Sequence, residues 1–207
     1  MTIDALDQCD TSAHILAMNR MTIFFGLCGL LAVVCALGQP VRAEIDLLKN
    51  SRLIEAVKVN DYDDAEKLLQ RGQNVDVRDE IRRTSLIIAA SQGSEDIVDL
   101  LIQHRAKLGA ADKFGNFALY YAAAGNHVGV VEILLEAKTD INSQNRQGLT
   151  ALIIAASSGH LATVQILLDG GADAGVTDFT GRTALDWAER NNRGSIARLL
   201  RARARRG

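Results

Sequence analysis

The chain repeats itself every 33 residues, and this period constrains its fold more than any other feature of the sequence. Equivalent units start at Thr84, Phe117, Thr150 and Thr183, and a weaker one starts at Ser51. Three positions keep the same residue type in all the units. They are the third (Leu53, Leu86, Leu119, Leu152, Leu185), the sixth (Ala56, Ala89, Ala122, Ala155, Ala188) and a late position (Leu68, Leu101, Leu134, Leu167, Leu200). A unit this short cannot bury its apolar residues alone, so the units are predicted to stack into one continuous core.

Each unit is predicted to contain two short helices. The clearest example is the segment Thr150 to Asp173, where apolar residues recur at helical spacing in two runs separated by Ser-Ser-Gly-His. Such spacing places the apolar side chains of each run on one helix face. Gly170 and Gly171 follow the second run, and glycine tolerates the left-handed conformation that ends many helices.

Several local motifs accompany the period. The segments Thr84–Ala89 and Thr150–Ala155 share the form Thr-x-Leu-x-x-Ala, and loops of the form Asp/Asn-x-x-Gly start at Asp112, Asn145 and Asp178. In these features, over Glu44 to Arg206, the chain resembles the ankyrin repeat family, whose unit has about 33 residues and a T-P-L-H-x-A opening. The resemblance implies an all-α fold, an ankyrin-repeat solenoid of stacked helix-turn-helix units joined by protruding turns.

The chain departs from the family pattern at two positions of the opening. Proline is absent from the second position and histidine from the fourth. The residues at the fourth position are Ile54, Ile87, Tyr120, Ile153 and Asp186. The loss of the histidine-to-turn hydrogen bonds is expected to affect local rigidity and not the fold. One turn also lacks the usual glycine, because Arg82 occupies that place.

The N-terminal residues 1–43 are predicted to form a leader, with the signal peptide itself at about 18–43. Arg20 precedes an apolar run from Ile23 to Leu37, and Val41-Arg42-Ala43 places a small residue before a cleavage point at Glu44. The alternative is an uncleaved anchor in the inner membrane, but the run is short for a span of about 20 residues. A lipoprotein is disfavoured because the bulky Val34 precedes Cys35. Residues 1–17 are too acidic for a signal, so translation could instead start at Met18 or Met21.

The predicted mature chain, residues 44–207, is one ankyrin repeat domain. It comprises an N-cap unit (44–83), repeats 84–116, 117–149 and 150–182, and a C-cap unit (183–207). The three cysteines, Cys9, Cys28 and Cys35, all precede the cleavage point. A domain without thiols suits an oxidising compartment, so a periplasmic location is expected, although the sequence leaves secretion open.

The C-terminus is strongly basic. No acidic residue follows Glu189, whereas seven arginines do: Arg190, Arg193, Arg198, Arg201, Arg203, Arg205 and Arg206. They can stabilise the C-terminal end of a helix, or they can dock the chain on an acidic protein or an anionic membrane. Nucleic-acid binding is not expected, because the rest of the domain is acidic and would repel phosphate.

The sequence contains none of the common catalytic motifs, and no enzyme activity is expected. No cofactor and no metal site are predicted. His127 and His160 lie 33 residues apart, so they occupy equivalent places in adjacent units. Packed helices are about 8–10 Å apart, too far for two nitrogens on one zinc. Both histidines are therefore interpreted as helix caps. Trp187 shares a first-helix column with Ile88, Tyr121 and Ile154, and is interpreted as a core residue.

The residues at the turn tips form the candidate binding site. Four of them are apolar where a turn requires no apolar group, and four basic residues border them. The apolar residues are Ile81, Phe114, Leu149 and Phe179, and the basic ones are Arg83, Lys113, Arg146 and Arg182. The alternative is that each apolar side chain folds back on its neighbour.

These observations favour a monomeric, non-enzymatic module that binds another protein in the periplasm and scaffolds, inhibits or protects it. Binding to a membrane is expected only if the leader stays uncleaved, which would make the chain a membrane-anchored adaptor. A hydrolase with an unfamiliar site is the remaining alternative.

Overall fold

The computed structural model describes residues 52–205. Within this range residues 52–58 are helical and nine α-helices follow: α3 (Tyr62–Gln70), α4 (Ser85–Gln92), α5 (Glu95–Gln103), α6 (Ala118–Ala124), α7 (Val128–Glu136), α8 (Ala151–Ser158), α9 (Leu161–Asp169), α10 (Ala184–Arg190) and α11 (Gly194–Ala204). The same range contains no strand, only one isolated antiparallel bridge between Arg78 and Thr84. None of the helices described is long and apolar enough to cross a membrane. The predicted leader and the start of the N-cap unit lie outside the described residues.

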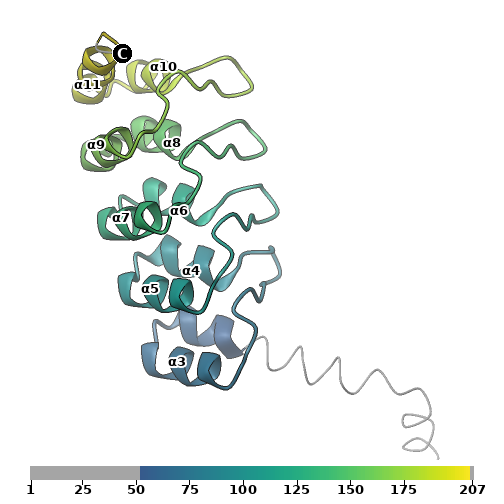
Figure 1. Ribbon diagram of the computed structural model, residues 1–207. Helices are drawn as coiled ribbons and strands as arrows, with labels where there is room; N and C mark the ends of the chain where they lie inside the picture. The colour runs from purple at the N-terminus through teal and green to yellow at the C-terminus, as the bar shows by residue number, and fades with distance from the viewer. Residues whose placement is uncertain (1–51, 206–207) are drawn as a thin grey trace, which may run out of the picture. The chain divides into compact units, whose positions relative to one another are not determined.

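The helices form two layers, and consecutive units stack on one another (Figure 1). The first helices α4, α6, α8 and α10 pack in that order, and the second helices α3, α5, α7, α9 and α11 form the other layer. The turns that join consecutive units project from the side of the first helices. The predicted all-α solenoid is therefore confirmed.

The repeated leucines and alanines form the core. The late leucine and the sixth-position alanine are buried in every unit. The third-position leucine is buried in four units, whereas Leu185 is only partly buried and packs at the edge of the core. Its helix, α10, packs on α8 and α11 and is the last of the first helices among the described residues.

Threonine starts three of the first helices. The side chains of Thr84, Thr150 and Thr183 accept a hydrogen bond from the backbone N–H three residues later, at 3.3, 3.2 and 3.3 Å. This bond satisfies one of the N–H groups that have no partner inside the helix. Phe117 holds the same place before α6 and makes no such bond.

The two histidines do not cap the helices that they precede. His127 and His160 occupy the N-cap positions of α7 and α9, but neither side chain makes a cap hydrogen bond there. Instead, Nε2 of His127 lies 3.2 Å from the Ser91 carbonyl oxygen, and Nε2 of His160 lies 3.0 Å from that of Ala124. Each imidazole thus binds the end of the first helix in the preceding unit. The predicted capping role is corrected to a contact between units, because the stack brings that helix end to the ring.

Candidate functional site

The turn row consists of the four tips at residues 78–83, 111–116, 144–149 and 177–182. Each tip is closed as a hairpin by a backbone hydrogen bond, as from Asp112 N–H to the Asn116 carbonyl at 3.1 Å. Consecutive tips are also bonded to each other. Backbone N–H groups of Lys113, Arg146 and Phe179 donate to carbonyls of Ile81, Phe114 and Gln147 at 3.1, 3.3 and 3.1 Å. The turn row is therefore a continuous ladder of backbone hydrogen bonds.

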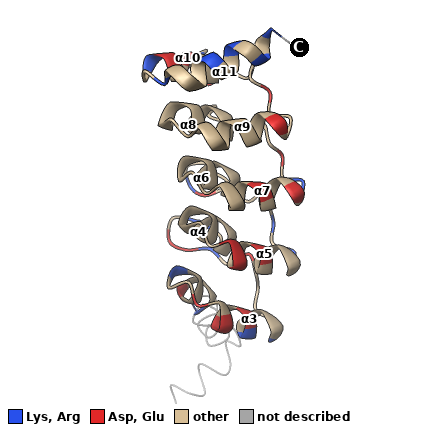
Figure 2. Cartoon of the chain, turned by 90° about the vertical axis from the view of Figure 1, so that its left-hand side faces the viewer, with Lys and Arg blue, Asp and Glu red and all other residues tan. Residues whose placement is uncertain are grey.

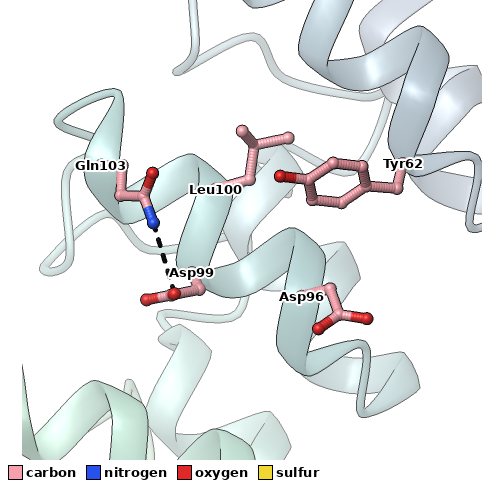
Figure 3. A pocket seen from close by; sticks show the side chains of 5 residues that line it. All are labelled: Tyr62, Asp96, Asp99, Leu100 and Gln103. Atoms are coloured by element: carbon pink, nitrogen blue, oxygen red, sulfur yellow. Dashed lines mark hydrogen bonds between the residues drawn. The ribbon is translucent and has the colours of Figure 1, made fainter.

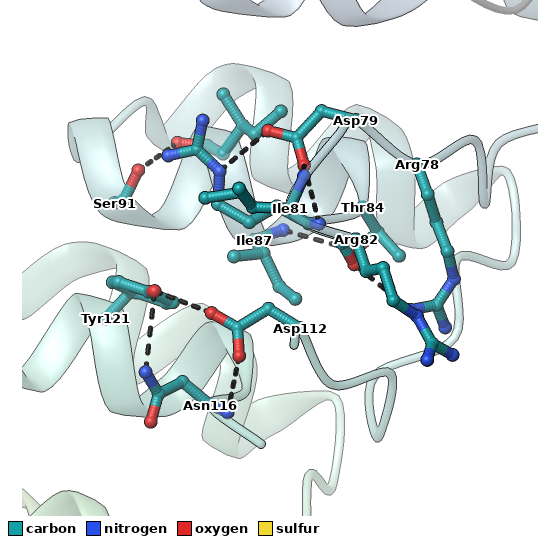
Figure 4. A network of polar contacts seen from close by, with 12 residues as sticks. Arg78, Asp79, Ile81, Arg82, Thr84, Ile87, Ser91, Asp112, Asn116 and Tyr121 are labelled. Carbon is teal, nitrogen blue, oxygen red and sulfur yellow. Dashed lines mark hydrogen bonds and ion pairs between the residues drawn. The ribbon is translucent and has the colours of Figure 1, made fainter. Parts of the chain in front are cut away.

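One acidic or amide side chain organises the inside of each tip. Asp79, Asp112, Asn145 and Asp178 each use Oδ1 to accept the backbone N–H groups two and four residues later. The distance from Asp112 Oδ1 to Phe114 N is 2.7 Å. The distance to Asn116 N is 2.9 Å, and this bond is drawn in Figure 4. These bonds replace the backbone partners that a tight turn lacks, and they hold the tips in one shape.

The second oxygen of each aspartate has its own donor. Tyr121 donates its hydroxyl to Asp112 Oδ2 at 2.7 Å, as Figure 4 shows, and Trp187 donates Nε1–H to Asp178 Oδ2 at 2.9 Å. Arg83 donates Nε–H to Asp79 Oδ2 at 2.8 Å.

In the third tip the second side-chain group is a donor and not an acceptor, because Asn145 stands in place of the aspartate. Its Nδ2 group donates to Asn116 Oδ1 in the preceding tip at 2.7 Å. Position 154 in this unit is correspondingly an isoleucine, which has no hydrogen to donate. Sequence reasoning missed this pairing, yet a signal existed. Asp112 and Asp178 are followed nine residues later by Tyr121 and Trp187, whereas Asn145 is followed by Ile154.

Trp187 is consequently more than a core residue. Its ring is partly buried against the core, its edge binds Asp178, and the guanidinium groups of Arg182 and Arg190 lie 5.7 and 5.8 Å from its centre. Burial of the Asp178 carboxyl opposes its ionisation. The hydrogen bonds from the Thr180 hydroxyl, the Arg182 N–H and the Trp187 indole more than offset this, and they hold the pKa of Asp178 well below its usual value.

Side chains also fasten one tip to the next. Arg78 donates to the Arg82 carbonyl in its own tip at 3.0 Å and to the Ala111 carbonyl in the next tip at 2.8 Å. Gln144 does the same two units later, with the carbonyls of Gly148 and Thr177 at 2.8 and 2.9 Å. Neither residue was predicted from the sequence, because the partners are backbone atoms and leave no pattern in the residue types.

The close approach of the next tip leaves no room for a side chain at two of the repeated glycines, Gly115 and Gly148. Gly148 has a φ of +79°, and a Cβ atom there would lie 2.6 Å from the Phe179 nitrogen. Arg82 stands in the equivalent place of the first tip with a φ of +66°, a conformation that costs about 1–2 kcal/mol for a residue with a side chain.

The eight predicted site residues all lie in the turn row, but they differ in exposure. Phe114 and Phe179 are 52% and 72% exposed. Ile81 and Leu149 are half-buried, and Leu149 packs against the core. The exposed apolar surface of the turn row therefore consists of two separate rings and not of a strip of four side chains.

The four predicted basic residues also have different surroundings. Arg83 is half-buried and forms an ion pair with Asp79. The Lys113 ammonium lies 4.9 Å from the centre of the Phe114 ring. Arg182 lies over Trp187 and donates to the Thr180 hydroxyl at 2.6 Å. Arg146 is exposed.

A shallow pocket lies between α3 and α5, in the layer of second helices (Figure 3). Its volume is about 230 Å³, and its lining residues are Tyr62, Asp96, Asp99, Leu100 and Gln103. Asp99 accepts a hydrogen bond from Gln103 at 3.3 Å. No three His, Cys, Asp or Glu side chains in residues 52–205 are grouped so that they could hold a metal ion.

Three of the C-terminal arginines contact other parts of the domain. Arg201 forms an ion pair with Glu189 at 2.6 Å, Arg203 pairs with Asp169 of the preceding unit, and Arg193 donates to the Ser157 carbonyl at 3.3 Å. Figure 2 shows basic residues, in blue, along α10 and α11. The contacts support the interpretation in which the arginines secure the final helix.

The chain was also compared with known proteins. A family model described as ankyrin repeats (3 copies) matches residues 53–145 and 137–205. No curated protein matches the chain.

Proposed function

Since the chain belongs to the ankyrin repeat family, we propose that it is a non-enzymatic module that binds another protein through its turn row. Binding would scaffold, inhibit or protect that partner. Ankyrin repeats are generally protein–protein interaction modules, which supports the first part of the proposal.

The observation that carries the proposal is the exposure of two aromatic rings on a rigid ladder. Phe114 and Phe179 are 52% and 72% exposed, although the turns need no apolar side chain at either place. Binding energy in protein interfaces concentrates in a few large side chains. The ladder also fixes the backbone before binding, which lowers the entropy cost of association.

Replacing both rings, Phe114→Ser with Phe179→Ser, is expected to weaken binding of the partner protein at least tenfold, which is about 1.4 kcal/mol. The helical circular dichroism and the unfolding midpoint are expected to stay nearly unchanged, because neither ring belongs to the core columns. The measurement is the affinity for a partner captured by the unmodified chain.

The matched control replaces two exposed apolar residues outside the turn row, Val59→Ser with Leu161→Ser, which are 64% and 44% exposed. This control should bind the partner normally. Unchanged binding by the folded double phenylalanine variant would place the site elsewhere, and loss of folding would show that the rings are structural.

We also propose that the chain acts in the periplasm after removal of residues 1–43. The order of Arg20, an apolar run and Val41-Arg42-Ala43 supports this proposal. N-terminal sequencing of the protein from a periplasmic fraction is expected to start at Glu44. A chain that keeps Met18 or Met21 and stays with the membrane after a salt wash would instead be an anchored adaptor.

A further inference from the structure

We propose that the partner contributes an acidic segment in an extended conformation, which lies along the turn row. This inference rests on the proposed function and names the chemistry of the partner. It starts from the charges that the turn row presents to solvent.

The exposed charges of the turn row are mostly positive. Arg78, Arg82, Lys113 and Arg146 are exposed, and Arg182 is half-buried. Among the residues that the structure describes, Arg83 is the one cation of the turn row with an ion-pair partner.

Almost all acidic side chains of the turn row are engaged by hydrogen bonds or an ion pair within the domain. Asp112 and Asp178 are 4% and 5% exposed, and hydrogen bonds from their own units engage both oxygens of each. The Asp79 side chain is 9% exposed and forms an ion pair with Arg83. Glu80 is the acidic residue of the row that is exposed. A ligand in contact with the row therefore meets chiefly cations and the two phenylalanine rings.

The layer of second helices is mainly acidic from α3 to α9, whereas α11 at its C-terminal end is basic. Exposed acidic residues lie on α3, α5, α7 and α9 and in the loops next to them (Figure 2). They are Asp61, Asp63, Glu95, Asp96, Asp99, Glu132, Glu136, Asp140, Asp169 and Asp173. Between α3 and α9 an acidic partner is repelled from this layer and attracted to the turn row, so the charge distribution there favours an acidic partner on the side of the turns.

The spacing of the tips favours an extended segment. Each tip is a tight turn whose two arms are joined by a backbone hydrogen bond, and consecutive tips are also hydrogen-bonded. Two strand spacings give about 9.5 Å between equivalent atoms of neighbouring tips. A polyproline II segment rises about 9.3 Å per turn of three residues. Acidic side chains at every third position would therefore face Lys113 and Arg146, which hold equivalent places in the second and third tips, whereas Glu80 and Phe179 hold that place in the first and fourth.

The exposure pattern favours a protein segment over a lipid surface. Binding to a membrane interface strengthens with the apolar area that is buried in it. Here Ile81 and Leu149, on the first and third tips, are half-buried. Two separate rings with cations between them suit a segment in which acidic and apolar side chains alternate along the row.

The test uses the whole chain and a fluorescent peptide made of four Glu-Pro-Leu triplets, with binding followed by anisotropy. We expect saturable binding that weakens as salt rises from about 50 to about 300 mM, because the Debye length falls with ionic strength. A peptide with Gln in place of Glu should bind at least about tenfold more weakly. A peptide of the same composition with its glutamates together at one end should also bind more weakly.

The variants separate the turn row from general charge effects. Lys113→Glu with Arg146→Glu should weaken binding of the Glu peptide at least about tenfold. The control is Arg105→Glu with Lys138→Glu. Both residues are exposed, have φ of +62° and follow second helices, so this control changes the net charge equally. It should shift the affinity by less than about twofold.

Three outcomes would overturn the inference: equal binding of the Glu and Gln peptides, equal losses in the two double variants, or tighter binding to phosphatidylglycerol vesicles or oligothymidylate than to the Glu peptide. In each case the proposed function would stand if the variant Phe114→Ser with Phe179→Ser still bound the captured partner protein more weakly than the unmodified chain. The two proposals therefore fail separately.

Discussion

Alanine in place of Gly93 is expected to lower the free energy of unfolding by about 2–5 kcal/mol. Gly93 ends α4 with a φ of +75°, a conformation that costs a residue with a side chain about 1–2 kcal/mol. A Cβ atom there would also lie within 3.0 Å of three atoms of the His127 ring. Overpacking of this kind adds about 1–3 kcal/mol. The ring cannot easily move aside, because it binds the Ser91 carbonyl and also lies against Gly125.

Gly72 provides the matched control for this substitution. Its φ is +77°, and a Cβ atom there would meet nothing within 4 Å. Gly72→Ala should therefore cost only the backbone strain of about 1–2 kcal/mol. Urea denaturation of both variants separates the strain from the clash. Equal losses would mean that the imidazole moves without cost.

A double-mutant cycle with His127→Ala identifies the ring as the cause. His127→Ala alone loses the contact with Ser91. When Gly93→Ala is added to that variant, the further loss of unfolding free energy should be little more than the loss caused by Gly72→Ala. The coupling between the two sites is expected to be about 1–3 kcal/mol. No coupling would show that the His127 ring is not the cause of the cost of Gly93→Ala.

Alanine in place of Asp178 is expected to cost about 3 kcal/mol. The carboxylate accepts four hydrogen bonds, from Thr180 N, Thr180 Oγ1, Arg182 N and Trp187 Nε1, at 2.8, 2.6, 2.9 and 2.9 Å. Hydrogen bonds to charged groups contribute about 1.5–3 kcal/mol each, and water can replace only part of them at a buried carboxylate. Asp173→Ala is the control, because Asp173 is exposed and accepts a bond from Gly175 in a similar local turn. Its loss should stay below about 1 kcal/mol.

The lowered pKa of Asp178 also predicts a dependence of stability on pH. The native carboxyl stays ionised below its usual pKa of 3.8, whereas the unfolded chain takes up the proton near that value. The contribution of Asp178 is therefore complete above about pH 4 and is lost as the pH falls from there towards the lowered native pKa.

Asp178→Asn should be less stable than the unmodified chain at neutral pH, because its amide nitrogen cannot accept the Trp187 N–H. It should also lose less stability between about pH 5 and pH 3, because it has no proton to take up. Urea midpoints over this pH range test the expectation. Parallel losses in both proteins would show that other carboxyl groups account for the acid sensitivity.

The features that repeat within a unit could be predicted from the sequence. The period and the leucine and alanine columns placed the helix pairs and most of the core, because apolar spacing along a helix is a local property. The loops from Asp112 to Gly115 and from Asp178 to Gly181 were recognisable for the same reason, since an aspartate bonds to N–H groups within its own turn.

Contacts between units were decided by the tertiary structure. The exposure of Phe114 and the half-burial of Leu149 depend on what the neighbouring chain segments cover, and their residue types alone carry no such information. The side chains of Arg78 and Gln144 bind carbonyls 33 residues further along the chain, and the His127 ring lies between two glycines and binds a helix end in the preceding unit. A backbone carbonyl is present at every position, so the sequence cannot show which one the stack brings within reach.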